Sequence, residues 1–300
     1  MTERAWMQGP PRRILLATDL SPRCDRALDR AATLAAAWNA ELMALHVMPE
    51  DPVDYDAPQI PSWRRPPSAQ MVAEAKARTE IHAVLPGASV AIERGDPADA
   101  ILRVAAAKGC DLIVTGVARY EPLGRLSLGS TVERLVRRSQ IPILVVRKRG
   151  QRPYGHVVTA TDFSEASRHA LEAVVRYFPS AILTLFHVYD VPMRGVAEHA
   201  PAHAQQFHDM ASQWAAQLLD QADLTGWPGE PKVLIEEGEP DRLLHDYAQS
   251  RGVDLVAVGA HGHGALYEVV IGSVAHRLLG TLPCDVLLIR EPKVTAGSTG

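Results

Sequence analysis

The chain contains one internal repeat, and this repeat constrains its fold more than any other feature. Four pairs of matching segments lie 143 residues apart: Thr18–Ser21 and Thr161–Ser164, Gly95–Pro97 and Gly238–Pro240, Asp111–Gly116 and Asp254–Gly259, Gly129–Ser130 and Gly272–Ser273. Four matches in one register indicate a duplicated domain of about 145 residues rather than a solenoid of short units. We therefore expect two domains, residues 1–150 and residues 151–300.

Within each copy, short apolar runs alternate with longer segments of helical pattern. The apolar runs, rich in β-branched residues, are Arg13–Thr18, Glu41–Val47, Val90–Glu93, Leu112–Gly116 and Ile143–Arg147 in the first copy, and His156–Thr161, Ile182–Val188, Val233–Glu236, Leu255–Gly259 and Val286–Arg290 in the second. Nearly continuous apolar runs are typical of strands covered on both faces. Alternating strands and helices form right-handed βαβ units. We predict an α/β fold of two tandem Rossmann-like domains, each a five-stranded, mostly parallel sheet flanked by helices.

The starts of two equivalent helices are readable from the sequence. Asp96 precedes a proline, so its carboxylate is placed to cap the helix while the proline occupies the first helical position. Glu239 takes the same place in the second copy and is a poorer cap. Gly95 and Gly238 precede these caps and are expected to adopt positive φ angles.

The charge balance argues against several kinds of partner. The 31 Lys and Arg residues are matched by 35 Asp and Glu residues, for a net charge of −4. Electrostatic binding to nucleic acid or to a membrane surface needs a basic excess, so we expect neither partner. No apolar run of about 18 residues and no signal-peptide pattern is present, which predicts a cytoplasmic protein. Three cysteines without CxxC spacing predict no metal site.

Glycines after the fourth strand of the second copy form a candidate phosphate site. The segment between Gly259 and Ser273 is rich in glycine and leads into a helix. Because glycine lacks a Cβ atom, backbone N–H groups can approach an anion closely, and a helix N-terminus adds about half a positive charge. Ligands of open parallel sheets bind beyond the carboxyl ends of the strands, where strand order reverses. Both Thr-Asp-x-Ser motifs are expected at that edge too.

These glycines carry a resemblance to a known family. The chain resembles a tandem universal stress protein of the UspA-like family. ATP-binding members carry Gly-x2-Gly-x9-Gly-(Ser/Thr) after the fourth strand, and Gly259, Gly262, Gly272 and Ser273 match that spacing. The resemblance covers nearly the whole chain and implies an adenine nucleotide alpha-hydrolase-like fold. It also implies ATP as the ligand, with or without Mg²⁺.

The same resemblance implies which residues contact the nucleotide. The family has an aspartate after the first strand, at the adenosine end, and reads adenine with backbone at the end of the second strand. The predicted contacts in the second copy are Asp162, Val188, Gly259, His261, Gly262, Gly272, Ser273 and Val274. Simpler roles stay open for some of them: the aspartates as helix caps, the glycine loop as a tight turn, Val188 as a core residue, and His261 as an exposed loop residue.

The first copy departs from the motif. Its weaker candidate contacts are Asp19, Val47, Gly116, Arg119, Gly129, Ser130 and Thr131. Arg119 stands where the second copy has Gly262. Its side chain either blocks the approach of phosphate to the backbone or folds into the site as a substitute cation. We expect the tight site in the second copy and a weak or empty one in the first.

The sequence contains no strong catalytic constellation. It lacks the Gly-x-Ser-x-Gly elbow and the kinase and zinc-protease motifs. The expected function is therefore that of an ATP-binding regulatory protein of the stress response. Two alternatives stay open: a slow ATPase or other ATP-using enzyme of the same α/β group, and a nucleotide-free structural dimerisation module.

The fifth apolar run of each copy predicts how the copies assemble. Ile143–Arg147 and Val286–Arg290 would be edge strands of isolated domains, and unpaired edges seek partners. In the family that the chain resembles, the fifth strand helps to form the dimer interface. We expect an intrachain pseudo-dimer of the two copies, and a homodimer of chains is possible in addition.

Overall fold

The computed structural model describes residues 9–21, 24–50, 68–117, 119–120, 126–150, 152–190, 200–260 and 272–290. The first copy contains β1 (Arg13–Thr18), α1 (Asp25–Trp38), β2 (Glu41–Met48), α2 (Ala69–Val84), β3 (Ser89–Arg94), α3 (Pro97–Ala107), β4 (Leu112–Gly116), β5 (Arg119–Tyr120), β6 (Leu126–Ser127), α4 (Ser130–Arg138) and β7 (Ile143–Val146). The second contains β8 (His156–Ala160), α5 (Glu165–Tyr177), β9 (Ile182–Tyr189), α6 (Ala200–Gln221), β10 (Lys232–Glu237), α7 (Pro240–Ser250), β11 (Leu255–Gly259), α8 (Ser273–Thr281) and β12 (Asp285–Ile289). None of the helices in these ranges is both long and apolar enough to cross a membrane.

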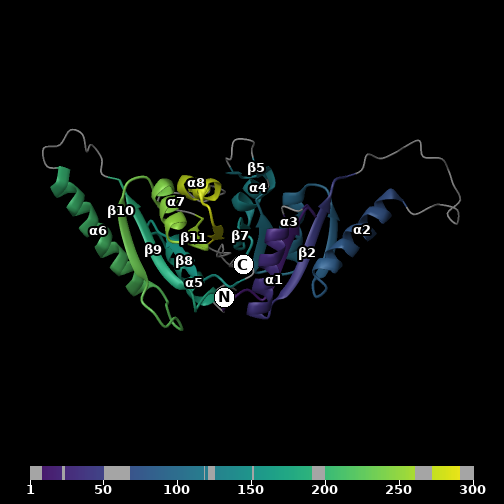
Figure 1. The fold of residues 1–300 in the computed structure, drawn as a ribbon, viewed down its shortest axis with the longest axis horizontal. Coiled ribbons are helices and arrows are strands. Elements are labelled where there is room, and N and C mark those ends of the chain that lie inside the picture. The colour runs from purple at the N-terminus through teal and green to yellow at the C-terminus, as the bar shows by residue number, and fades with distance from the viewer. Residues whose placement is uncertain are drawn as a thin grey trace, which may run out of the picture.

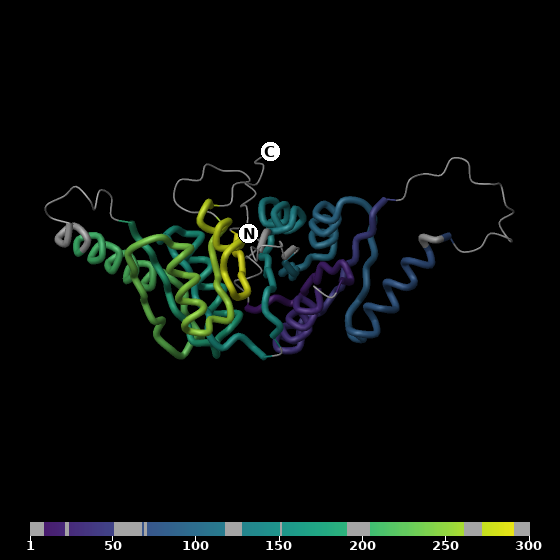
Figure 2. The backbone as a smooth tube through the Cα atoms, turned by 45° about the horizontal axis from the view of Figure 1, so that its top comes forward, coloured from purple at the N-terminus to yellow at the C-terminus, as the bar shows by residue number. Residues whose placement is uncertain are grey.

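The main strands of both copies form one ten-stranded sheet. Its order is β10-β9-β8-β11-β12-β7-β4-β1-β2-β3, and all neighbours are parallel except β12 and β7. These two fifth strands pair antiparallel, with Leu287 opposite Leu144. Figure 1 shows the continuous sheet with α2 and α6 at opposite ends of the molecule, and Figure 2 shows one copy on each side of the join. The predicted fold is confirmed, and the apolar edges bury each other as an intrachain pseudo-dimer.

Alternate residues of each strand pack into two apolar cores, one on each face of the sheet. In β1, Ile14 and Leu16 pack into the core beneath α1 and α5. Leu15 and Ala17 pack into the core on the side of α3 and α8. Successive side chains of a strand point to opposite faces, so a strand covered on both faces must be apolar throughout. This is why the strand segments of the sequence are continuous apolar runs.

The two predicted helix starts differ as expected. The carboxylate of Asp96 accepts a hydrogen bond from the backbone N–H of Asp99 at 3.0 Å and caps α3. The side chain of Glu239 makes no such bond at the start of α7. Gly95 has φ +105° and Gly238 has φ +143°, which confirms that both positions need backbone conformations that side chains disfavour.

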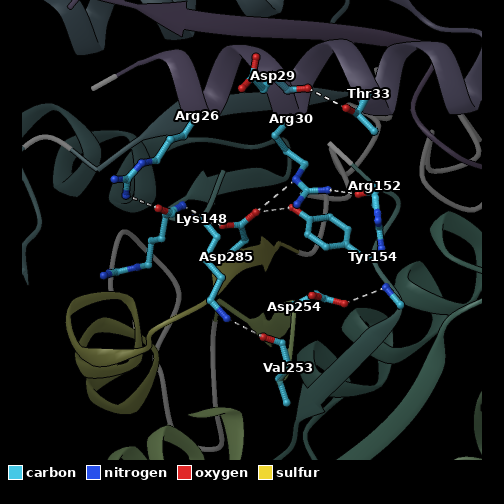
Figure 3. Close-up of polar contacts among 12 residues, drawn as sticks. Arg26, Asp29, Arg30, Thr33, Lys148, Arg152, Tyr154, Val253, Asp254 and Asp285 are labelled. Atoms are coloured by element: carbon cyan, nitrogen blue, oxygen red, sulfur yellow. Dashed lines mark hydrogen bonds and ion pairs between the residues drawn. The ribbon is translucent and has the colours of Figure 1, made fainter. Parts of the chain in front are cut away.

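A buried carboxylate, Asp285, ties the first copy and the linker to the second copy (Figure 3). Its Oδ1 accepts from the backbone N–H groups of Arg147 (2.7 Å) and Lys148 (3.0 Å). Its Oδ2 accepts from the hydroxyl of Tyr154 (2.8 Å) and lies 3.3 Å from Nε of Arg30. Burial raises the pKa of Asp285, and the surrounding donors oppose that rise. The network fixes the chain where it crosses from β7 to β8.

A short hairpin after β4 was not predicted. β5 and β6 pair antiparallel, with Arg119 opposite Ser127. Two-residue strands are too short for a periodic signal, so the sequence pattern could not reveal them. The backbone of Arg119 is therefore held in a hairpin in the first copy, at the position of the predicted phosphate loop.

Candidate functional site

A cavity of about 570 Å³ lies at the carboxyl edge of the second copy's sheet. The ends of β8 and β11 form its floor, and these neighbouring strands connect onward in opposite directions along the sheet. Such a reversal of strand order is where open α/β sheets bind ligands, and the volume suits a small molecule. The cavity therefore occupies the place that the sequence predicts for the site.

Most of the predicted contacts of the second copy come together in this cavity. The lining residues are Ala160, Thr161, Asp162, Ser167, Phe186, His187, Val188, Pro240, Leu244, Val258, Gly259, Gly272, Ser273, Val274, Ala275 and Leu278. Two predicted contacts, His261 and Gly262, lie outside the described residues. The lining combines an apolar surface with hydroxyl, carboxylate, imidazole and backbone groups, as is usual for sites that bind an amphipathic ligand.

The Thr-Asp-Phe-Ser motif forms a tight turn that presents Asp162 at the cavity. The backbone N–H of Phe163 donates to Oγ1 of Thr161 at 2.9 Å, and the backbone N–H of Ser164 donates to Oδ1 of Asp162 at 3.1 Å. Between these bonds Phe163 has φ 62°, an uncommon conformation for a bulky residue. Backbone strain of this kind persists only where its surroundings enforce it, and it is concentrated at functional sites.

The first copy repeats this turn. Leu20 has φ 60°, and its N–H donates to Oγ1 of Thr18 at 3.1 Å. The N–H of Ser21 donates to the carboxylate of Asp19 at 2.9 Å. In both copies the aspartate thus binds a turn N–H. The N-cap of α5 is Ser164, so the alternative that Asp162 caps this helix is wrong.

His187 lines the cavity and was not among the predicted contacts. Its Nδ1 lies 2.8 Å from the carbonyl oxygen of Thr161, so Nδ1 carries the proton because a carbonyl can only accept. Burial lowers the pKa of His187, which favours the neutral ring. The ring also packs against Phe163 at 4.2 Å between centroids. The sequence did contain a usable signal: the second strand of each copy has His-Val just before its last residue, at His46–Val47 and His187–Val188.

The first turn of α8 offers the cavity a set of backbone donors. Its N-cap, Gly272, has no side chain to satisfy them, and no acidic residue lies in the first turn. The first N–H groups of a helix have no partner inside it and carry the positive end of the helix dipole. Because Gly272, Ser273, Val274 and Ala275 all line the cavity, this turn is suited to an anion.

Gly259 has a steric role that the sequence motif did not reveal. A Cβ atom at this position would lie 2.6 Å from the carbonyl carbon of Ala166 and 2.8 Å from the backbone nitrogen of Ser167. Both neighbours belong to the first turn of α5, which packs against the end of β11. The residue must be glycine so that this helix can lie close to the strand and hold the Thr-Asp-Phe-Ser turn in place.

The candidates of the first copy take equivalent positions in the fold. Val47 lies in β2, Gly116 ends β4, Gly129 is the N-cap of α4, and Ser130 and Thr131 begin that helix. One feature distinguishes α4 from α8: it carries an acidic residue, Glu133, in its first turn. A carboxylate there opposes a bound phosphate. Among the described residues of both copies, no group of three or more His, Cys, Asp or Glu side chains is placed to hold a metal ion.

Comparison with known proteins decides the family. The sequence pattern described as the universal stress protein family matches the chain twice, over residues 11–147 and 153–290. The chain belongs to the universal stress protein family. A universal stress protein of Mycolicibacterium smegmatis is 26% identical over 310 residues, which span 92% of this chain and 96% of that protein. Universal stress protein Rv2005c of Mycobacterium tuberculosis is 25% identical over 305 residues, 93% and 97% of the two chains. The resemblance found in the sequence is confirmed.

Solved structures support the tandem fold of this universal stress protein. A putative universal stress protein from Pseudomonas aeruginosa has a TM-score of 0.62 at 21% identity and covers 95% of each chain. One from Archaeoglobus fulgidus has a TM-score of 0.62 at 18% identity, covering 93% of this chain and 98% of that one. A universal stress protein in complex with cAMP matches 46% of this chain at 27% identity, with a TM-score of 0.33.

Proposed function

We propose that this universal stress protein binds ATP in the cavity of its second copy and acts in the stress response as a nucleotide-dependent regulatory protein. The observation that carries the proposal is the cavity at the switch point between β8 and β11, lined by Asp162 and by the uncapped first turn of α8. The cavity places hydrogen-bond donors suited to an anion beside an apolar surface. A nucleotide, with its charged phosphate chain and flat base, matches this combination.

The parts of the nucleotide can be assigned to parts of the cavity by their chemistry. The phosphates belong at Gly272, Ser273 and Val274, where N–H donors and the helix dipole favour negative charge. The base belongs on the apolar surface that includes Val188 and Leu244, both cavity residues. Asp162 lies on the turn between the sheet and α5 and lines the cavity, where its carboxylate can accept from a ribose hydroxyl.

The two copies are not equivalent in this proposal. Glu133 places a carboxylate in the first turn of α4 itself, whereas in α8 this carboxylate is met by His276, whose Nε2 lies 3.9 Å from Glu133 Oε1. The negative charge therefore acts most directly on the phosphate end of the first copy. Arg119 replaces the second motif glycine in the first copy. Both differences favour one tight site per chain, in the second copy.

The cavity residues favour binding over catalysis. In the described part of the lining, Asp162 and His187 are the only side chains that carry an acidic or a basic group. Both already bind the backbone of the Thr-Asp-Phe-Ser turn, through Ser164 and Thr161 respectively. Efficient phosphoryl transfer needs a positioned water and charge neutralisation at the phosphates. These residues supply neither, so a regulatory role is the better assignment.

The proposal is tested by titration calorimetry of the full chain with ATP, ADP, AMP and cAMP. We expect ATP to bind with one tight site per chain. Asp162→Ala should weaken that site, because it removes the carboxylate from the cavity. Asp19→Ala is the matched control, since it removes the same turn bond, to Ser21, in the first copy. It should leave the affinity within about twofold, a difference smaller than 0.5 kcal/mol.

Three results would count against the proposal. Absence of heat and of any thermal shift with ATP would favour a nucleotide-free structural module. Two equal sites per chain would contradict the asymmetry between the copies. Multiple turnovers per minute to ADP or AMP, abolished by Asp162→Ala, would assign an enzyme instead.

A further inference from the structure

Each of the two helices that begin at a candidate phosphate site is held at its other end by the opposite copy. The guanidinium of Arg147, directly after β7, donates to the carbonyl oxygen of Leu279 in α8. The guanidinium of Arg290, directly after β12, donates to the carbonyl oxygens of Val136 and Arg137 (2.8 Å) in α4. Arg147 and Arg290 are 143 residues apart, as are Val136 and Leu279. The contact is thus reciprocal across the join between the copies.

Both arginines donate to carbonyl groups in the last turn of a helix. The last carbonyl groups of a helix have no N–H partner within it and carry the negative end of the dipole. Arg147 is 4% exposed and Arg290 is 5% exposed, so both cations act where water screens them little. A buried cation that satisfies a buried carbonyl fixes the helix along its axis. The opposite end of the same nine-residue helix, α8, carries the donors of the cavity.

Arg147 is itself rigidly held. Its backbone N–H donates to Asp285 Oδ1 at 2.7 Å, and its carbonyl accepts from Nη1 of Arg26 in α1 at 2.7 Å. Figure 3 shows Arg26, Lys148 and Asp285 grouped around this point of the chain. Arg147 therefore links the backbone at the end of the first copy to α8 and fixes where α8 lies relative to that copy.

We infer that Arg147, a residue of the first copy, is a positioning residue for the nucleotide site of the second copy. It acts on the first turn of α8 through its bond to Leu279, near the far end of the helix. The inference rests on the proposed ATP site and adds that this site is complete only when both copies are joined. Arg290 has the same role toward α4, where no tight site is proposed.

Arg147→Met tests this, because methionine keeps the buried volume while removing the donors, and buried ionic groups often tolerate such a replacement. We expect ATP affinity to fall about tenfold, within the range of the interaction between a cation and a helix C-terminus. The matched control is Arg290→Met, which removes the symmetric contact to Val136 and should leave ATP affinity unchanged. Amide hydrogen exchange in the nucleotide-free protein should rise in α8 for the first variant and in α4 for the second.

The outcomes separate this inference from the proposed function. If wild-type protein binds ATP and both variants bind it equally well, or both lose affinity equally, Arg147 does not position the site. If the wild type binds no nucleotide, the proposed function fails, and unchanged exchange in α8 of Arg147→Met would independently refute the positioning. Should Arg147→Met not fold, Arg147→Lys retains the cation with a shorter reach and should give an intermediate affinity.

Discussion

A single methyl group added at Gly259 should disturb both the stability of the protein and its candidate site. A Cβ atom there would lie 2.6 Å from the carbonyl carbon of Ala166, far inside normal contact distance. The clash is with backbone, so no side chain can rotate away, and the first turn of α5 must shift by several tenths of an ångström. Gly259 packs directly against the backbone of α5, and close-packed elements of this kind resist such movement.

The expected loss follows from the general cost of overpacking. Forcing extra volume into a well-packed region costs about 1–3 kcal/mol. Gly259→Ala should therefore lower the free energy of unfolding by about 2 kcal/mol in a urea titration followed by circular dichroism. Because α5 carries the turn that presents Asp162, ATP affinity should fall as well.

Gly280→Ala provides the control within the same copy. Nothing lies within 4 Å of a Cβ atom built at Gly280, and this residue is inside α8. Alanine should stabilise the protein there by about 0.5–1 kcal/mol, because it lowers the backbone entropy lost on folding. If Gly259→Ala unfolds at the same urea concentration as the wild type, the steric role assigned to Gly259 is incorrect.

Two further predictions concern local interactions. Burial holds the pKa of His187 below its ordinary 6.5, so on acidification the unfolded chain binds a proton at this residue before the folded chain does. The free energy of unfolding therefore decreases as the pH falls through 6.5. Between about pH 7.5 and about pH 5.5 the wild type should lose more unfolding free energy than His187→Gln, and equal slopes would contradict this. Asp96→Ala should lower the free energy of unfolding by about 1 kcal/mol through loss of the cap, whereas Glu239→Ala should change it little. If Asp96→Ala and Glu239→Ala unfold at the same urea concentration, the Asp96 cap contributes nothing to stability.

Local patterns in the sequence determined the order of elements and the approximate place of the site. The continuous apolar runs and the Asp-Pro helix start are patterns within a few neighbouring residues, and the 143-residue repeat is a match between two such patterns; the structure bears all three out. The residues Asp162, Val188 and Ser273 lie far apart along the chain. They could be placed at one edge only because parallel strands end at the same side of a sheet.

Tertiary structure alone decided how the parts act on one another. The sequence indicated that the fifth strands join the copies, but the structure decided the antiparallel direction and register of β7 and β12. It also decided the close approach of α5 to Gly259 and the hydrogen bond from Arg147 to Leu279. Contacts of this kind depend on packing between layers, and no periodicity of the sequence encodes them. The sequence by itself thus determined that the chain has two copies and at which edge of the sheet the candidate site lies. The joined sheet made the two copies structurally dependent on each other.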